Sequence, residues 1–236
     1  MGKVLRNDGI VIFSRMGSTR LPGKALLPLG KSTVLGCVIN QLRYCLGGDE
    51  LVVATSHLKV DDPIASFAES QGVAVFRGAH SDVIGRTTSC MKFYDFQNIV
   101  RISGDSPFID PELVDKALAI HHELSADITT NIPGRTFPYG QSVEVLSRKA
   151  VSELADKTTD AADREHVTSY VYKNKDEFNI QNFTAKSTKY AGLRLVIDTA
   201  SDYERALRIF SLIGDDSTIV SLEDVVTAAT SLEAHS

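Results

Sequence analysis

Short runs of β-branched and aliphatic residues recur along this chain and alternate with longer segments that have the period of an amphipathic helix. The runs predict strands over residues 10–14, 51–55, 73–76 and 98–103. The longer segments predict helices over residues 33–46, 62–71, 81–94 and 110–124. This alternation constrains the fold class to α/β and favours a doubly wound, mainly parallel, Rossmann-like sheet with helices on both faces.

Ligands of such sheets bind beyond the carboxyl ends of the strands, so the residues that follow each strand are the first candidates for a site. The first strand is followed by the glycine-rich, cationic loop of residues 15–24, and the fourth by Gly104-Asp105-Ser106-Pro107. Near the C-terminus, "LRLVID" predicts a strand that ends at Asp198, followed by a helix with Ser201 as its N-cap. We therefore expect a basic loop and two carboxylates at one edge of the sheet.

The basic loop stands out because the chain as a whole is acidic. Residues 1–31 contain six lysines and arginines and a single acid, Asp8, although the net charge of the chain is −5. The loop has neither Walker A spacing nor a dinucleotide Gly-x-Gly-x-x-Gly motif, which disfavours a dehydrogenase. Its glycines still let backbone amides approach an anion, and its cations suit a polyphosphate. We predict a phosphate-binding loop, with a solvated basic turn as the alternative.

Two carboxylates at strand ends suggest a metal. A buried carboxylate is costly unless it is paired or binds a cation, so Asp105 and Asp198 are candidate ligands of Mg²⁺. A metal beside bound phosphates is what phosphoryl transfer requires. For Asp105 the alternative is a turn cap before Pro107, and Asp202 is expected to be an ordinary acid in the first turn of a helix.

Two further segments are informative. Residues 131–147 contain two prolines and two glycines, which predicts a pocket-shaping loop followed by a strand that carries Glu144. The stretch "DREHVTSYVYKN" places Arg164, Glu165 and His166 at the start of a helix. A histidine there is more often packed or capping than catalytic, so the role of these three residues stays open.

Composition narrows the class of protein. With 236 residues and 43% hydrophobic residues, the chain is predicted to form a single domain over residues 1–236. Its apolar runs are far shorter than the roughly 20 residues that span a bilayer, and no signal peptide is recognisable, which indicates a cytoplasmic protein without a membrane partner. The acidic charge argues against a nucleic-acid partner. The three cysteines form no Cys-x-x-Cys pair, so neither a disulfide framework nor a zinc site is expected.

Several motifs together resemble the cytidylyltransferase family, which contains the CMP-Kdo and CMP-sialic acid synthetases. The resemblance extends from Ile10 to Ile213 and is carried by "RMGSTRLPGKALLPLGKSTVL", "VVATS", "DDPI", "RISGDSPFIDPELVD", "DREHVTSYVYKN" and "LRLVIDTASDYE". It is closest to the SpsF-like branch, named for spore-coat polysaccharide biosynthesis, where "RMGSTRLPGK", "GDSP" and "REHVT" occur together. The resemblance implies a nucleotide-diphospho-sugar-transferase fold, CTP and Mg²⁺ as requirements, an acidic sugar as acceptor, and release of pyrophosphate.

The resemblance also implies site residues. Arg15 and Lys24 would hold the triphosphate and act with Asp105 and Asp198 as the catalytic residues. The residues that shape the triphosphate loop are Gly17, Ser18 and Arg20. The residues around cytosine and ribose are Ala54, Thr55, Arg77, Asp82 and Arg86. The metal ligands are Asp105 and Asp198, and the residues on the acceptor side are Asn131, Tyr139, Gln141 and Glu144.

One motif departs from the branch. Its acceptor loop usually reads Gly-Leu-Asp-Val-Glu, whereas residues 140–144 here read Gly-Gln-Ser-Val-Glu. The acceptor therefore stays open among Kdo-, sialic-, pseudaminic- and legionaminic-type acids. Alternatives are a transferase that uses a phosphonate, a sugar phosphate or another nucleoside triphosphate, and an inactive nucleotide-binding relative.

The family pattern also divides the chain. Residues 1–130 are expected to form the nucleotide-binding half and residues 131–190 the acceptor and dimerisation region. Residues 191–236 are expected to supply a closing strand and the C-terminal helices. Family members are commonly homodimers, so a homodimer is expected here.

Overall fold

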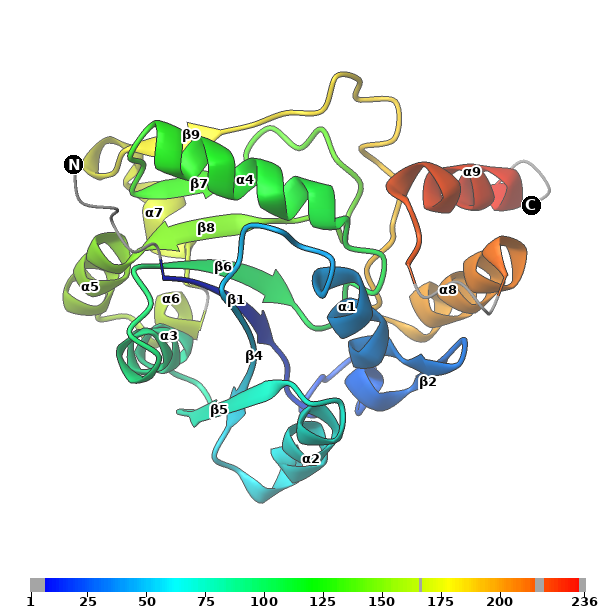
Figure 1. Ribbon diagram of the computed structural model, residues 1–236, viewed down its shortest axis with the longest axis horizontal. Coiled ribbons are helices and arrows are strands. Elements are labelled where there is room, and N and C mark those ends of the chain that lie inside the picture. The colour runs from blue at the N-terminus through cyan, green and yellow to red at the C-terminus, as the bar shows by residue number, and fades with distance from the viewer. Residues whose placement is uncertain (1–6, 166, 215–218, 234–236) are drawn as a thin grey trace.

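The computed structural model describes residues 7–165, 167–214 and 219–233. A seven-stranded sheet runs across these residues in the order β5-β4-β1-β6-β8-β7-β9. Its strands are β1 (Asp8–Phe13), β4 (Glu50–Ser56), β5 (Ala74–Gly78), β6 (Asn98–Ser103), β7 (Ile128–Thr130), β8 (Glu144–Ser147) and β9 (Ile180–Asn182). All neighbouring pairs are parallel except those of β8, which is antiparallel to β6 and β7 and points against them in Figure 1.

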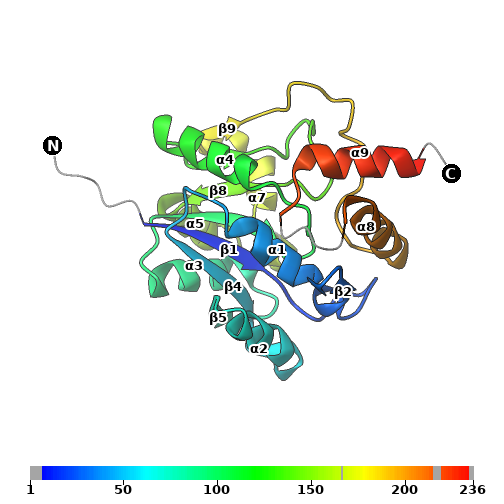
Figure 2. The same ribbon diagram turned by 45° about the vertical axis from the view of Figure 1, so that its right-hand side comes forward.

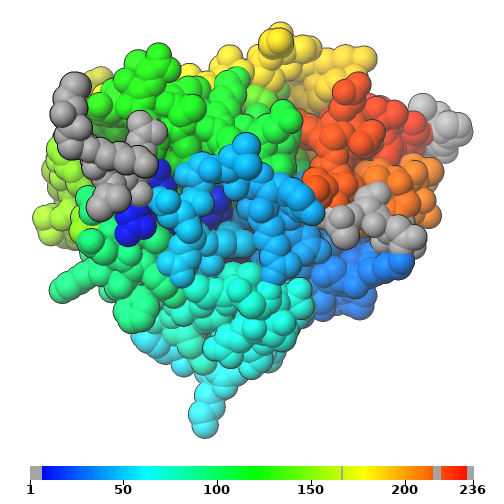
Figure 3. All heavy atoms as spheres, viewed as in Figure 1, coloured from blue at the N-terminus to red at the C-terminus, as the bar shows by residue number. Residues whose placement is uncertain are grey.

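Helices cover both faces of the sheet. On one face lie α1 (Val34–Leu42), α2 (Asp62–Ser70) and α4 (Pro111–Glu123), and their atoms cover the front of the molecule in Figure 3. On the other face lie α3 (Val83–Phe93), α5 (Arg148–Lys157) and α7 (Ser169–Lys173). Ile10 and Ile12 of β1 pack on the first group and Val11 on the second. A strand buried on both faces in this way is apolar throughout, which explains the uninterrupted apolar runs in the sequence.

The C-terminal helices form a separate layer. α8 (Ala200–Ile213) and α9 (Leu222–Glu233) lie side by side beyond the end of the sheet to which β1 and β6 point (Figures 1 and 2). They share an apolar cluster with Leu29, Phe108 and Ile197. The short elements are η1 (Lys24–Leu26), β2 (Pro28–Leu29), β3 (Ser32–Thr33), η2 (Lys59–Asp61), α6 (Ala161–Glu165) and η3 (Lys175–Glu177). No helix in the described part of the chain has the length and apolar character to span a membrane.

The four strands and four helices predicted in the N-terminal half are confirmed, with differences at their ends. β4 and β5 run on to Ser56 and Gly78 because these two residues still pair with each other. α1 ends at Leu42 and begins after Thr33, whose Oγ1 accepts a hydrogen bond from the Gly36 amide at 3.1 Å. Asp110 is the N-cap of α4 and accepts a hydrogen bond from the Glu112 amide.

Two predictions near the C-terminus are wrong. The segment before Asp198 is extended but is not a strand of the sheet, because it hydrogen-bonds to loops: Leu195 N to Tyr139 O at 2.8 Å and Ile197 N to Asp105 O at 2.9 Å. The N-cap of α8 is Thr199 and not Ser201. Thr199 and Asp202 exchange hydrogen bonds in a capping box, which satisfies two amides of the first turn.

Candidate active site

A cavity of about 380 Å³ lies at the carboxyl ends of β1 and β6. The chain runs from β1 outward to β4 and β5 and then returns to β6 on the other side of β1, so strand order reverses at this point. Such switch points are where doubly wound sheets bind ligands. Of the predicted site residues, those that line the cavity are Arg15, Gly17, Ser18, Arg20, Lys24, Arg86, Asp105 and Asp198.

The loop between β1 and η1 is anchored at both ends. Met16 N donates at 2.7 Å to Asp61 Oδ1, and the Asp61 side chain is fully buried. Gly23 adopts a left-handed φ of 72°, which glycine accepts without strain, and its amide closes the loop on Met16 O at 3.1 Å. Within the described chain, the amides of Gly17, Thr19 and Arg20 donate no hydrogen bond. The loop that lines the cavity therefore has backbone donors that no described residue uses.

Lys24 joins the two carboxylates. Its Nζ donates to Asp105 Oδ2 at 2.5 Å and to Asp198 Oδ1 at 2.8 Å. The three side chains are at most 23% exposed, so each charge depends on the others for compensation. The Ile197–Asp105 backbone hydrogen bond explains how carboxylates so far apart in sequence meet, because it ties the segment before Asp198 to the loop after β6.

The remaining loop cations are also paired with acids. Arg15 Nη2 lies 2.5 Å from Glu165 Oε1 of α6, and Arg20 Nη2 lies 3.2 Å from Asp198 Oδ2. Arg15, Glu165 and Arg20 are each more than a third exposed, so these pairs are weak and a polyphosphate can replace the carboxylates. The loop of the free protein thus keeps cations in place without burying them.

Asp105 and Asp198 supply oxygen atoms that suit a divalent cation. Asp105 Oδ1 is buried and has no hydrogen-bond partner in the described part of the chain. Its other oxygen and one oxygen of Asp198 already share a cation, the Lys24 ammonium. Mg²⁺ is commonly held by one or two carboxylates together with substrate phosphates, and this pair fits that pattern. No group of three or more metal-binding side chains occurs among the described residues.

Four residues that the resemblance assigned to cytosine and ribose lie outside the cavity lining. Ala54 and Thr55 are fully buried in β4. Arg77 pairs with Asp62 at 2.6 Å. Asp82 caps α3 and binds Arg164 at 2.8 Å. Burial raises the pKa of Asp82, but the hydrogen bonds from Arg164 and the Gly85 amide outweigh it, so the pKa is lowered.

The residues assigned to the acceptor side also lie outside the cavity lining. Asn131 and Gln141 are buried and bind backbone: Asn131 Nδ2 donates to Gln141 O, and Gln141 Oε1 accepts from Asp110 N. Tyr139 is 40% exposed between two arginines. Glu144 is 1% exposed and binds Arg101 and Tyr172.

The structure adds cavity residues that were not predicted as site residues, and Arg101 is the most informative. An arginine within "NIVRIS", a strand buried in mid-sheet, needs a partner or a function. This requirement is the signal in the sequence that could have identified Arg101 as a site residue. Arg164 and Glu165 are the last residues of α6 and not the start of a helix, so that prediction is wrong. Arg164 ties α6 to α3 through Asp82, Glu165 lines the cavity, and His166 lies outside the described residues. Burial lowers the pKa of Arg86 to about 10, helped by the positive charges of Arg15 and Arg101.

Comparisons with known proteins agree with this architecture. A family model described as cytidylyltransferase matches residues 10–224. The spore coat polysaccharide biosynthesis protein SpsF of Bacillus subtilis is 32% identical, over 92% of this chain and 91% of that protein. A 3-deoxy-manno-octulosonate cytidylyltransferase of Psychromonas ingrahamii is 26% identical, over 78% and 71%. The structure of a cytidylyltransferase from Leptospira borgpetersenii superposes with a TM-score of 0.91 at 32% identity, covering 97% of this chain and 96% of that one.

The superposition confirms the predicted fold, a mainly parallel Rossmann-like sheet of the nucleotide-diphospho-sugar-transferase type. The match to the family model extends over nearly the whole sheet and includes the cavity, from β1 to α9. The chain therefore belongs to the cytidylyltransferase family, in its SpsF-like branch, and is a CTP-dependent enzyme.

Proposed function

We propose that this enzyme transfers the cytidylyl group of CTP to a hydroxyl of an acidic sugar of the 3-deoxy-ulosonic class, in the presence of Mg²⁺, for the synthesis of surface polysaccharide. Relatives named for 3-deoxy-manno-octulosonate and for spore coat polysaccharide support this acceptor class. The observation that carries the proposal is the joining of Asp105 and Asp198 by Lys24 within one cavity.

The loop residues bind the triphosphate. The amides of Gly17, Thr19 and Arg20 and the side chains of Arg15 and Lys24 offer hydrogen-bond donors and positive charge to phosphate oxygens. Negative charge grows on the β-phosphate as the bond from the α-phosphorus to its bridging oxygen breaks. Cations placed at that oxygen therefore stabilise the transition state more than the ground state.

Asp105 and Asp198 would hold the metal. When bound, Mg²⁺ neutralises charge on the α-phosphate and lowers the pKa of the attacking hydroxyl. The acceptor oxygen forms a bond to the α-phosphorus, its proton passes to water, and pyrophosphate leaves. No side chain of this chain is assigned as a general base.

We also propose that the enzyme is a cytoplasmic homodimer, with residues 131–190 as the acceptor and dimerisation region. The support is the family resemblance, and sedimentation equilibrium tests the oligomeric state. A monomer at micromolar concentration contradicts that part of the proposal and leaves the chemistry unaffected.

A pyrophosphate-release assay tests the reaction. Each of the four nucleoside triphosphates is combined with 3-deoxy-manno-octulosonate, N-acetylneuraminate, a hexose phosphate and a neutral hexose, with Mg²⁺ present or chelated. We expect release with CTP, an acidic sugar and Mg²⁺ together. Turnover with the hexose phosphate or the neutral hexose, and none with either acidic sugar, would overturn the proposed acceptor class. In a crystal soaked with CTP and Mg²⁺, the triphosphate should lie on residues 15–24.

A further inference from the structure

Arg101 lies in the cavity although it belongs to a strand in the middle of the sheet. Its backbone pairs with Val11 of β1 on one side and with Glu144 of β8 on the other. Because side chains alternate along a strand, Arg101 and Ser103 share one face of β6, and both line the cavity. The side chain of Arg101 is 28% exposed, so the cavity reaches its guanidinium.

A buried acid holds this guanidinium in place. Glu144 is 1% exposed, and its Oε2 accepts from Arg101 Nη1. Its Oε1 accepts from the Tyr172 hydroxyl at 2.7 Å, and that hydroxyl also lies 3.1 Å from Thr130 Oγ1. Burial and the charge of Glu144 raise the pKa of Tyr172, so the hydroxyl stays protonated. Both oxygens of Glu144 are therefore occupied, and the carboxylate acts on the cavity through Arg101.

Most of the hydrogen-bonding capacity of Arg101 is unused. A guanidinium carries five N–H donors, and among the described residues only Glu144 accepts from this one. Its Nε is buried with no partner in the same part of the chain, and so is the Nε of Arg86. Both guanidinium carbons lie over the Phe13 ring, 5.8 Å and 5.6 Å from its centroid. Two cavity-lining cations with unsatisfied donors thus meet over the Phe13 ring.

The position of Arg101 separates it from the triphosphate loop. The loop follows β1, whereas Arg101 lies on β6, which borders β8 on its other side. Asp105 lies four positions after Arg101, at most roughly 13 Å of extended chain, so one small acceptor can reach both. A planar guanidinium fork binds a carboxylate with two parallel hydrogen bonds, and an unsatisfied buried donor is costly until such a group arrives.

We propose that Arg101, oriented by Glu144 and Tyr172, binds the carboxylate of the acceptor and thereby selects acidic sugars. This inference rests on the proposed function. It makes Arg101 a specificity-determining residue and Glu144 a positioning residue that does not touch the acceptor.

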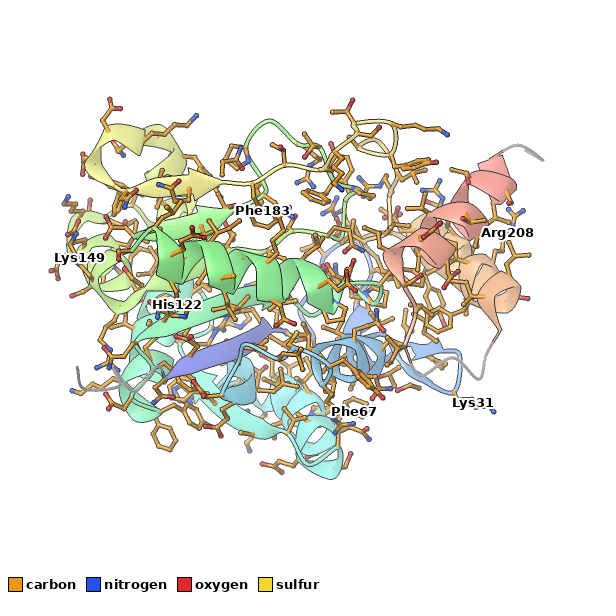
Figure 4. The ribbon with its side chains drawn as sticks, turned by 45° about the horizontal axis from the view of Figure 1, so that its top comes forward. Lys31, Phe67, His122, Lys149, Phe183 and Arg208 are labelled. Atoms are coloured by element: carbon orange, nitrogen blue, oxygen red, sulfur yellow. The ribbon has the colours of Figure 1, made fainter. Side chains whose placement is uncertain are left out.

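The test is the steady-state kinetics of Arg101→Gln with CTP and 3-deoxy-manno-octulosonate. We expect the KM for the acid to rise roughly 10- to 100-fold, because a charge-assisted hydrogen-bonded pair is lost. The KM for CTP should stay within about twofold. Arg101→Lys keeps the charge without the fork and should recover part of the loss. The matched control is Arg20→Gln on the triphosphate loop, which should raise the KM for CTP instead. Arg208→Gln, exposed on α8 (Figure 4), should change neither.

Further variants separate recognition from folding. Arg101→Gln leaves the buried Glu144 carboxylate without a counter-charge and can therefore destabilise the fold. If this single variant melts below the assay temperature, the double variant with Glu144→Gln, which removes both charges, carries the test. Tyr172→Phe should raise the acceptor KM by a smaller factor, about two- to fivefold, because it loosens Glu144 alone. The preference of the wild type for the acid over its carboxamide should shrink in Arg101→Gln, which a purely structural role would not produce.

The outcomes are distinguishable. If wild-type enzyme uses the acid and the folded Arg101 variant retains its acceptor KM, or loses CTP affinity equally, this inference is overturned and the proposed function stands. If wild-type enzyme uses no acidic sugar, both are overturned.

Discussion

Buried charges are arranged in opposite ways at the two ends of the strands. The side of the sheet where β1 and β6 begin is called the amino edge here, and the side where they end is called the carboxyl edge. At the amino edge, near the labelled His122 in Figure 4, Asp8 is 1% exposed. Its Oδ1 accepts from Asn98 Nδ2 at 2.8 Å and its Oδ2 pairs with His122 Nε2 at 2.6 Å. Asn98 also bonds to His121, whose other ring nitrogen lies 3.1 Å from Thr129 Oγ1. The network links β1, β6, β7 and α4, and its polar atoms satisfy one another.

At the carboxyl edge, the charged groups have incomplete hydrogen bonding. Asp105 Oδ1, Arg86 Nε and Arg101 Nε are buried with no partner among the described residues, and all three residues line the cavity. Satisfied polar networks hold elements together, whereas unsatisfied ones are costly and persist where a ligand completes them. One edge therefore stabilises the fold, whereas the other leaves polar atoms unpaired at the site where the proposed reaction would take place. Four predictions test this contrast.

The largest effect is expected at the carboxyl edge. Asp105→Asn should lower kcat roughly 100- to 1000-fold, because a metal-binding charge at the α-phosphate is lost, while CTP binding persists in part. The melting temperature should change little, because Lys24 keeps Asp198 as its counter-charge. Pyrophosphate release and calorimetric CTP titration measure the two effects, with Asp95→Asn, an exposed acid, as control. A wild-type rate for this variant with Mg²⁺ would contradict the assignment of Asp105 as a metal ligand.

The amino edge should respond in the opposite way. Asp8→Ala leaves His122 and Asn98 without their partner, so we expect the free energy of unfolding to fall by about 3 to 4 kcal/mol. kcat and both KM values should stay within about twofold at a temperature where the variant is folded. Urea denaturation and the pyrophosphate assay measure these quantities. A large loss of kcat in folded Asp8→Ala would contradict the division of roles between the edges.

The amino edge should also weaken in acid. Burial, with help from the positive charge of His122, lowers the pKa of His121 to about 4, below its usual value near 6.5. The unfolded chain therefore binds a proton first, and stability falls as the pH drops from about 6.5 to about 4, by up to about 3 kcal/mol. Denaturation at several pH values should give a steeper decline for wild type than for His121→Gln. Parallel declines would rule out His121 as the cause.

The smallest effect concerns Asp202, a well-satisfied carboxylate that accepts from the Asp198 amide. Burial raises the pKa of Asp202, but hydrogen bonds from Arg194, Thr199 and the Asp198 amide outweigh it and lower the pKa to about 2. Asp202 thus contributes stability above about pH 4 that disappears as the pH falls towards 2. At pH 7, Asp202→Asn should be less stable by about 2 kcal/mol. A gap to wild type that stays constant down to pH 2 would argue against this assignment.

Some site residues were within reach of the sequence and others were not. Lys24 and Asp105 follow predicted strands, so strand-end reasoning located them. Asp61, which anchors the loop from the side of β4, carried no local signal, because its partner Met16 is 45 residues away. Glu144 was correctly expected on a strand, but its burial against Arg101 and Tyr172 depends on how β6, β8 and α7 meet.

The segment before Asp198 shows the same limit for the fold. Its apolar, β-branched residues have the pattern of a strand, and the backbone is indeed extended. Whether an extended segment joins a sheet depends on which edge is free, and here its partners are Tyr139 and Asp105 in loops. A pattern within a few residues cannot distinguish these cases.

Local signals in the sequence are enough to predict the buried strands, the capped helices, the glycine-rich basic loop and the position of both acids after extended segments. Which charges meet depends on the packing of distant segments. Lys24 reaches partners 81 and 174 residues away, and Arg101 is oriented by an acid 43 residues away. The physical reason is that hydrophobic period and turn chemistry act over about one element, whereas ion pairs and unsatisfied donors depend on strand order and on packing between distant segments.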